Sequence, residues 1–265
     1  AASGTSADPF NSIASFNSLA VDSANDYIYI RKGGSTYSET GGFILLNGQQ
    51  VYGAGQSLSF TNPVTSAVVN IATGVLADAP TLSVTGASIN GVTLAQDNKL
   101  TGFNIATTLA SQTGIADGAG TVGNLPISDM DVTGVGMAVD IDEGGVLSVA
   151  FDTLSSSGSS QQGVQLAGTA LSGSFSAATG SISGSTGTGV KGAAFMIGDG
   201  SGTANTGGTV AVTYGGSVAS TGTARTVDIQ DRASGAGAIT LSGSVTHTSG
   251  NGTAVFIDDV AAGAI

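Results

Sequence analysis

The chain has no cysteine and no tryptophan, and aromatic residues make up only 5% of its 265 residues. Without cysteine, a secreted protein has no disulfides to stabilise it. The scarcity of aromatic rings argues against a bulky globular core and favours a narrow core of small aliphatic side chains. No run of 18 or more apolar residues occurs, so the sequence predicts no membrane-spanning helix and no membrane insertion of this segment.

Basic residues are also scarce. Six Lys and Arg stand against 18 Asp and Glu, which gives a net charge of −12. Binding to nucleic acid or to an anionic membrane needs clustered Lys and Arg, so both partners are disfavoured. The single histidine, His247, excludes a histidine-rich metal site. An acidic surface still permits the binding of divalent cations.

What the chain has instead is a repeat. From about residue 90 onward, a short apolar segment returns about every 25 residues, with gaps of 23 to 32, and is followed each time by Gly-rich polar sequence. A period of this length indicates stacked structural units. The first large apolar residues of the successive segments are Val92, Ile115, Val139, Val164, Phe195, Val227 and Val255.

Each period contains two or three short apolar segments, many of which alternate apolar and polar residues. Alternation at period two is typical of strands with one buried and one exposed face. The Thr-, Val-, Ser- and Gly-rich composition is poor for helices, and propeller blades need about 40 residues. The sequence therefore predicts an all-β fold, a parallel β-helix in which each period forms one rung.

The first ninety residues follow a different pattern. Asp8 and Pro9 predict the N-cap and first turn of a short helix over 8–20, which we expect to cap the end of the solenoid. Residues 27–90 are expected to form the first, less regular rungs, and residues 91–265 the regular ones, within a single domain spanning 1–265. The chain begins without a signal peptide and ends in what looks like the middle of a rung, so we expect a piece of a longer exported protein.

Several motifs carry a family resemblance. The segments at 7–13 (ADPFNSI), 26–33 (DYIYIRKG) and 37–39 (YSE) resemble the entry to right-handed parallel β-helix proteins of the pectate-lyase-like superfamily. There, a capping helix leads into the first rung. Residues 46–55, 91–94 and 98–105 fit the same pattern, and the later rungs are similar to repeats of large bacterial surface and autotransporter-type proteins. The resemblance implies a right-handed β-helix, but this fold hosts lyases, hydrolases and adhesins alike.

The densest acidic cluster offers candidate chemistry. If rungs stack as expected, residues one period apart lie about 5 Å apart, and their carboxylates could converge. The cluster could then be a calcium site, a pair of catalytic carboxylates of a glycosidase, or simply a solvated acidic face. The calcium interpretation makes calcium the one cofactor to consider, with the candidate ligands Asp129, Asp131, Asp140 and Asp142.

The longer gaps between 195 and 227 predict loops that leave the rungs. Such insertions often map to a binding face. The candidate binding residues in these loops are Asp199, Ser201, Asn205 and Thr206.

The remaining polar residues are expected to be structural. Asp258 and Asp259 lack the Gly-His-Gly and Arg-x-Lys segments that accompany such a pair in β-helix polygalacturonases. His247 is interpreted as a lone exposed strand histidine. Arg225 and Arg232 are expected to pair locally with the acidic residues between them.

The functional expectation is a non-enzymatic segment of an extracellular or cell-surface bacterial protein. It would be an adhesin or rigid stalk that presents loops to a host or environmental glycan or surface protein, and it would be joined to other domains of the same longer chain. The alternatives are a polysaccharide lyase or glycoside hydrolase, and a pure structural spacer. The enzyme interpretation requires that the four aspartates line one groove together with Lys99 or Lys191.

Overall fold

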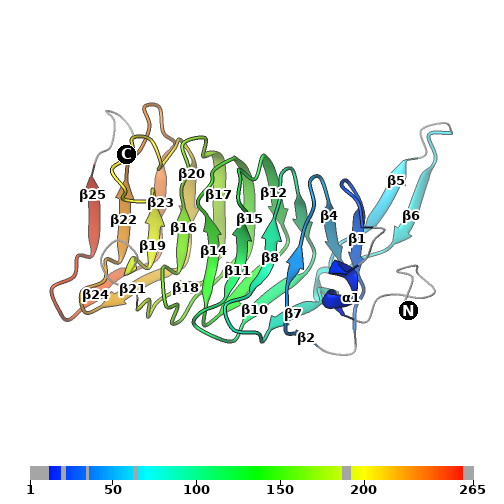
Figure 1. Cartoon of the computed structure of the whole chain (residues 1–265), viewed down its shortest axis with the longest axis horizontal. Coiled ribbons are helices and arrows are strands. Elements are labelled where there is room, and N and C mark those ends of the chain that lie inside the picture. Colours follow the sequence, from blue (N-terminus) through cyan, green and yellow to red (C-terminus); the bar gives the residue numbers. More distant parts are fainter. Residues whose placement is uncertain (1–11, 19–21, 34–35, 62–64, 187–191, 259–265) are drawn as a thin grey trace.

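The protein is a rod of stacked rungs in the computed structural model (Figure 1). The structure describes residues 12–18, 22–33, 36–61, 65–186 and 192–258. Almost every strand in these ranges pairs in parallel with the strand one rung away. The all-β parallel β-helix solenoid that the repeat predicts is thus confirmed. No helix in these ranges is both long and apolar enough to cross a membrane.

One face of the rod is an eight-stranded sheet with one strand from each rung. Its register matches the repeat in the sequence, because Ile115 pairs with both Val92 and Val139, and Phe195 pairs with both Val164 and Val227. The strands are β3 (Phe43–Ile44), β8 (Asn90–Leu94), β11 (Thr113–Asp117), β14 (Met137–Ile141), β16 (Val164–Leu166), β19 (Phe195–Ile197), β22 (Val227–Gln230) and β25 (Val255–Asp258).

The other two faces share a twelve-stranded sheet, which the long strand β15 (Val146–Leu154) joins by pairing with β12 at one end and β13 at the other. The second face contains β1 (Tyr27–Ile30), β4 (Gln50–Gly53), β9 (Lys99–Thr101), β12 (Asn124–Ser128), β17 (Ser172–Thr179), β20 (Ala211–Tyr214) and β23 (Ile239–Leu241). The third contains β2 (Tyr37–Glu39), β7 (Thr81–Val84), β10 (Asn104–Thr107) and β13 (Asp131–Gly134), and a separate sheet continues it with β18 (Ser181–Ile182), β21 (Ser217–Thr221) and β24 (Val245–Thr248).

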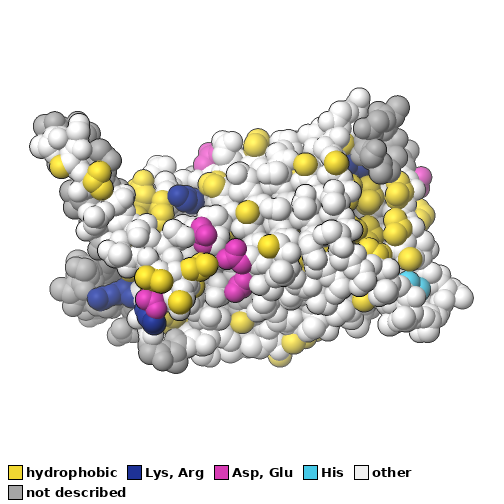
Figure 2. Space-filling model, turned by 180° about the vertical axis from the view of Figure 1, so that it is seen from behind, with side chains coloured by type: hydrophobic (Ala, Val, Ile, Leu, Met, Phe, Trp, Pro, Cys, Tyr) yellow, Lys and Arg dark blue, Asp and Glu magenta, His cyan; other side chains and the backbone are white. Residues whose placement is uncertain are grey.

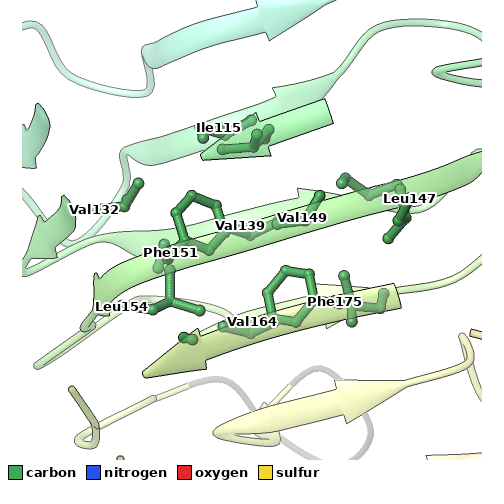
Figure 3. Packing of buried hydrophobic residues seen from close by; sticks show 14 of the residues in the cluster. Ile115, Val132, Val139, Leu147, Val149, Phe151, Leu154, Val164 and Phe175 are labelled. Atoms are coloured by element: carbon green, nitrogen blue, oxygen red, sulfur yellow. The ribbon is translucent and has the colours of Figure 1, made fainter. Parts of the chain in front are cut away.

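The core is a column of inward-facing aliphatic side chains with a short aromatic stack (Figure 3). Phe151 and Phe175 meet edge to face at 5.8 Å between ring centroids, and Phe175 meets Phe195 at 6.4 Å. Tyr214 continues the stack at 5.7 Å from Phe195, and its buried hydroxyl donates to the carbonyl of Leu154. The few aromatic residues therefore link consecutive rungs through the centre of the rod.

Several strands of the first face have a glycine directly before their large apolar residue, and the reason is steric. A Cβ on Gly114 would lie 2.5 Å from Val132 Cγ1, and a Cβ on Gly163 would lie 2.3 Å from Ile182 Cγ2. An inward side chain from the third face already occupies that space. This explains the glycine directly before the large apolar residue in these rungs, whereas other rungs have Ala or Thr at the same position.

Buried amides fix two of the corners. Asn98 is fully buried and donates to the carbonyls of Leu46 and Gln49, while its own oxygen accepts from the Ala95 amide. In the same way, the Gln112 side chain donates to the Gly86 carbonyl, and its oxygen accepts from the backbone amides of Thr108 and Leu109. These side chains satisfy backbone groups that the turns leave without strand partners.

The N-terminal helix is shorter than predicted. Helix α1 spans Ile13–Asn17 and is capped by Ser12, whose Oγ accepts from the Ser15 amide. The predicted N-cap, Asp8, and the following Pro9 lie outside the described residues. The helix packs on the first rung: Phe16 meets Phe43 edge to face at 5.6 Å, and Asn17 bonds to both Gly42 and Ile44.

The segment expected to form the less regular rungs contains an insertion. Strands β5 (Leu58–Thr61) and β6 (Val68–Ala72) form an antiparallel hairpin that projects from the rod near β1 (Figure 1). The 3₁₀ turn η1 (Leu76–Asp78) then returns the chain to the rung. Alternating apolar residues look the same in a hairpin and in a rung, so the sequence alone did not separate them.

Candidate functional site

The four aspartates predicted as calcium ligands do not lie together. Asp129 and Asp131 occupy the corner between β12 and β13, in the twelve-stranded sheet. Asp140 lies on β14 of the eight-stranded sheet, and Asp142 follows directly after that strand. The predicted set is therefore divided between two faces of the rod.

The first pair gains a partner that the sequence analysis missed. Burial, then the charges of Asp131 and Asp129, raise the pKa of Asp152 above its ordinary value. Asp152 comes from β15, one rung further along the rod, so only the strand register brings it to this corner. The Asp131 amide donates to Asn104 Oδ1 at 2.9 Å, which fixes the corner to the previous rung. Figure 2 shows a small group of acidic side chains over the middle of one face of the rod.

The second pair also gains a partner from a neighbouring rung, Asp117 on β11. Asp117 Oδ2 accepts from the amides of Asp142 and Glu143 at 2.9 and 2.8 Å. Burial raises the pKa of Asp117 to about 7, opposed by these amide hydrogen bonds and supported by the charges of Asp142 and Asp140. Burial and the charge of Asp142 raise the pKa of Asp140 to about 6, and its Oδ1 is buried without a hydrogen-bond partner. Asp117 and Asp140 therefore bind their protons more tightly than ordinary carboxyl groups do.

Neither group is a metal site or an acid–base groove in the structure. Within the described ranges, no three acidic, histidine or cysteine side chains are arranged to hold a metal ion. Lys99 stacks over the ring of Tyr52, 4.9 Å from its centroid, on the second face of the rod. Lys191 lies outside the described residues. The groove that the enzyme interpretation requires, with all four aspartates on one side, is not formed.

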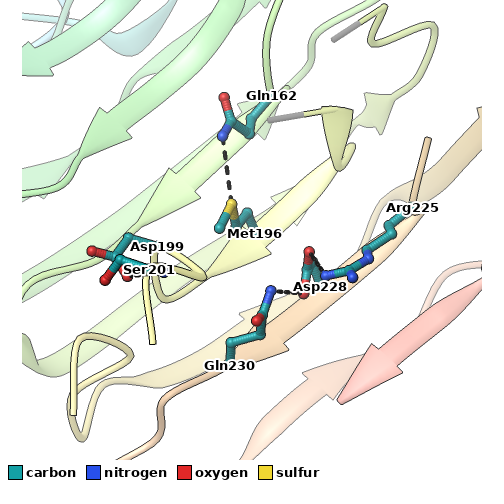
Figure 4. A network of polar contacts seen from close by, with 7 residues as sticks. All are labelled: Gln162, Met196, Asp199, Ser201, Arg225, Asp228 and Gln230. Carbon is teal, nitrogen blue, oxygen red and sulfur yellow. Dashed lines mark hydrogen bonds and ion pairs between the residues drawn. The ribbon is translucent and has the colours of Figure 1, made fainter. Parts of the chain in front are cut away.

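The loop predicted to bind a partner lies between β19 and β20, and Figure 4 shows Asp199 and Ser201 side by side in it. Its own polar side chains hold it. Asp199 Oδ1 accepts from the Ser201 amide and from Thr206 Oγ1, both at 2.9 Å. Although burial raises the pKa of Asp199, these hydrogen bonds outweigh it and lower the pKa below its ordinary value. Thr206 is buried, whereas Ser201 and Asn205 are exposed. Asp199, Thr206 and Ser201, whose Oγ accepts from the Thr203 amide at 3.1 Å, thus shape the loop, and Ser201 and Asn205 present it to solvent.

A buried arginine forms hydrogen bonds to the backbone at the base of this loop. Arg232 is only 1% exposed and donates to the carbonyls of Gly207, Val210 and Gly237 at 2.6 to 3.0 Å. It makes no ion pair with a described carboxylate, so the expected local pairing is wrong for Arg232. The loop base is instead fixed by the fork of the guanidinium group, which suits several carbonyls at once.

The local ion pair predicted for Arg225 is confirmed. Arg225 Nη1 lies 2.7 Å from Asp228 Oδ2, and the guanidinium covers the ring of Phe256 at 3.5 Å from its centroid. Gln230 donates to the other Asp228 oxygen at 2.7 Å (Figure 4). Burial raises the pKa of Asp228 although Arg225 and Gln230 oppose the shift.

His247 lies on β24, as expected, but it is not fully exposed. Its Nδ1 lies 2.9 Å from Ser220 Oγ, and that hydroxyl lies 2.6 Å from Thr226 Oγ1. Ser220 is only 2% exposed, whereas His247 is half-buried, so this contact ties the ring to the buried interior of the rung. The other candidate pair is half described: Asp258 is exposed at the end of β25, and Asp259 lies outside the described residues.

Comparison of the chain with models of protein families, with curated protein sequences and with solved structures found no significant match. No relative therefore assigns a role to either acidic group or to the loop.

Proposed function

We propose that the chain is a non-catalytic β-helix module of an extracellular bacterial surface protein, of the adhesin or rigid-stalk type, and that it descends from the pectate-lyase-like superfamily. It would hold its loops at fixed positions along a stiff rod for a glycan or a surface-protein partner. The loop between β19 and β20 is the proposed contact, through its exposed residues Ser201 and Asn205.

The separation of the carboxylates is the observation that carries this proposal. A polysaccharide lyase or glycosidase needs carboxylates that face one substrate, with a basic group or a metal ion beside them. Here the two acidic groups lie on different sheets, and no described Lys or Arg forms an ion pair with either. The loop, in contrast, is rigidly built: Arg232, Thr206 and Asp199 hold its shape before any partner arrives. A preorganised loop loses less entropy on binding.

The test is an array of acidic and neutral polysaccharides, with retention of the protein and release of products both measured in calcium. Retention without new oligosaccharides would support the proposal. The variants Ser201→Arg and Asn205→Arg should reduce retention, whereas Thr248→Arg, an exposed substitution on β24, should leave it unchanged.

The competing functions give different results in the same assay. New oligosaccharides, lost in Asp142→Asn or Asp129→Asn, would replace the proposal with a lyase or hydrolase. An array that shows neither retention nor products, repeated with intact cell surfaces, would leave the structural spacer. The assay thus separates the three functions without assuming the identity of the ligand.

A further inference from the structure

The hairpin β5–β6 has the features of an arm that pairs with another strand. In the described part of the chain it forms a two-stranded sheet of its own, and neither strand pairs with the rod. It projects beyond the first rungs, with β6 on its outer side (Figure 1). A two-stranded hairpin in water is marginally stable, and three or more strands are usually needed. The arm therefore gains stability from any strand that extends it.

The base of the arm is fixed to the rung. The Gly74 amide donates to Ser57 Oγ at 3.1 Å, and the Val75 amide donates to the Ala54 carbonyl at 3.2 Å. At the base of the arm, the segments that enter and leave the hairpin lie very close together. A Cβ on Gly74 would lie 2.1 Å from the carbonyl carbon of Gln56. The hairpin thus leaves the rod at a defined place, and this placement presents its outer edge.

The outer edge of β6 lacks the charged residues that usually prevent an edge strand from pairing with another chain. Exposed edge strands commonly carry Lys or other charged residues that oppose association. This chain has no charged residue between Glu39 and Asp78. The sequence of β6 is VVNIA, rich in β-branched residues, and Val68 at its start is 64% exposed.

A second copy is the partner that this arm suits, because its own β6 presents the same uncharged and β-branched edge. Each chain carries a net charge of −12, so two rods repel one another wherever their acidic faces approach. The arm carries no charged residue, so two chains can pair through their arms without electrostatic repulsion. Because the arm projects from the rod, this pairing keeps the two acidic rods apart. Identical strands can pair antiparallel across a two-fold axis, which closes the assembly at a dimer.

We propose that β6 pairs antiparallel with β6 of a second copy and joins the two hairpins into a four-stranded sheet. The pairing is centred on Asn70, the middle residue of Val68–Ala72, whose side chain is exposed and would face its own counterpart. This inference does not depend on the proposed function, because it concerns the arm and not the loop between β19 and β20.

Sedimentation velocity over a range of protein concentrations tests the pairing. The wild-type chain should form a dimer at physiological ionic strength. Both Asn70→Lys and Asn70→Asp should weaken self-association by about tenfold or more, because each places two like charges across the axis. Val75→Lys is the matched control, since Val75 is 57% exposed beside the hairpin but outside both strands, and it should dimerise like the wild type.

Mixing the two Asn70 variants distinguishes lost pairing from lost folding. Asn70→Lys and Asn70→Asp should recover a heterodimer together, which a misfolded arm cannot do. A wild-type chain that stays monomeric at every concentration would overturn the proposal. So would a dimer that Asn70→Lys leaves intact, or one that Val75→Lys disrupts equally.

Discussion

Asp140 illustrates how the stacking of rungs determines the chemistry of a single side chain. Burial and the charge of Asp142 raise its pKa from 3.8 to about 6, so the folded state binds its proton more tightly than the unfolded state. The resulting stability is fully present below about pH 4 and is lost as the pH rises through about 6. Asp140 therefore destabilises the rod at neutral pH relative to a neutral residue.

The variant Asp140→Ala tests this sign. Ala116 occupies the same register position one rung away, so alanine fits the sheet. We expect Asp140→Ala to raise the free energy of unfolding by about 1 kcal/mol near pH 8 and to have little effect near pH 4. Thermal unfolding across this pH range measures it, with Glu143→Ala, an exposed carboxylate on the same turn, as the control. An equal effect at both pH values would contradict the explanation.

The sequence placed Asp129, Asp131, Asp140 and Asp142 in one set because they are close along the chain. The structure groups them with Asp117 and Asp152, which are neighbours only through the register between rungs. That register depends on where each corner turns, and a strand as long as β15 removes one corner altogether. Proximity along the chain was therefore a poor guide to proximity on the surface.

At the scale of elements, α1 protects one end of the rod. Asn17 donates to the Gly42 carbonyl at 2.8 Å and accepts from the Ile44 amide at 3.3 Å, so its side chain covers backbone groups of β3, the end strand of its sheet. This is how a cap prevents end-to-end association of a solenoid.

We expect Asn17→Ala to destabilise the chain by about 1 to 2 kcal/mol and to promote association through the freed edge. Light scattering and urea unfolding measure the two effects. The background should be Asn70→Lys, which separates this association from pairing of the hairpins. Ser15→Ala, on the exposed side of the same helix, is the control. Unchanged scattering for Asn17→Ala would show that the side chain does not protect the edge.

Elements differed in how well the sequence predicted them. The strands of the first face were predictable because a large apolar residue recurs in each of them, preceded in several by a glycine that packing against the third face requires. The hairpin β5–β6 was not, because its pairing direction depends on the turn between its strands and not on the alternation of apolar residues.

The rod as a whole is a linear array in which each rung packs on its neighbours, so its cooperativity depends on the interfaces between rungs. The aromatic stack from Phe151 through Phe175 to Phe195 and Tyr214 spans three rungs and crosses two consecutive interfaces in the middle of the rod, because Phe195 and Tyr214 lie on the same rung. Few other rings are buried in the described core, so this stack is the strongest candidate for coupling the two halves.

Truncation of the central ring should uncouple the halves. Phe175→Ala leaves a cavity at a side chain that is 1% exposed, and the expected cost is about 3 to 5 kcal/mol. Because that cost falls on two adjoining interfaces, thermal unfolding should separate into two transitions, with the rungs after β17 losing amide protection first. The last described strand, β25, exposes Val255 and Ile257, whereas α1 covers β3 at the opposite end of the same sheet. Hydrogen exchange resolved by segment would detect the order, and Phe256→Ala, outside the core, should keep a single transition.

If Phe175→Ala lowered the stability of all rungs equally, the rod would fold as one unit, and coupling would have to come from the continuous backbone ladders of the sheets.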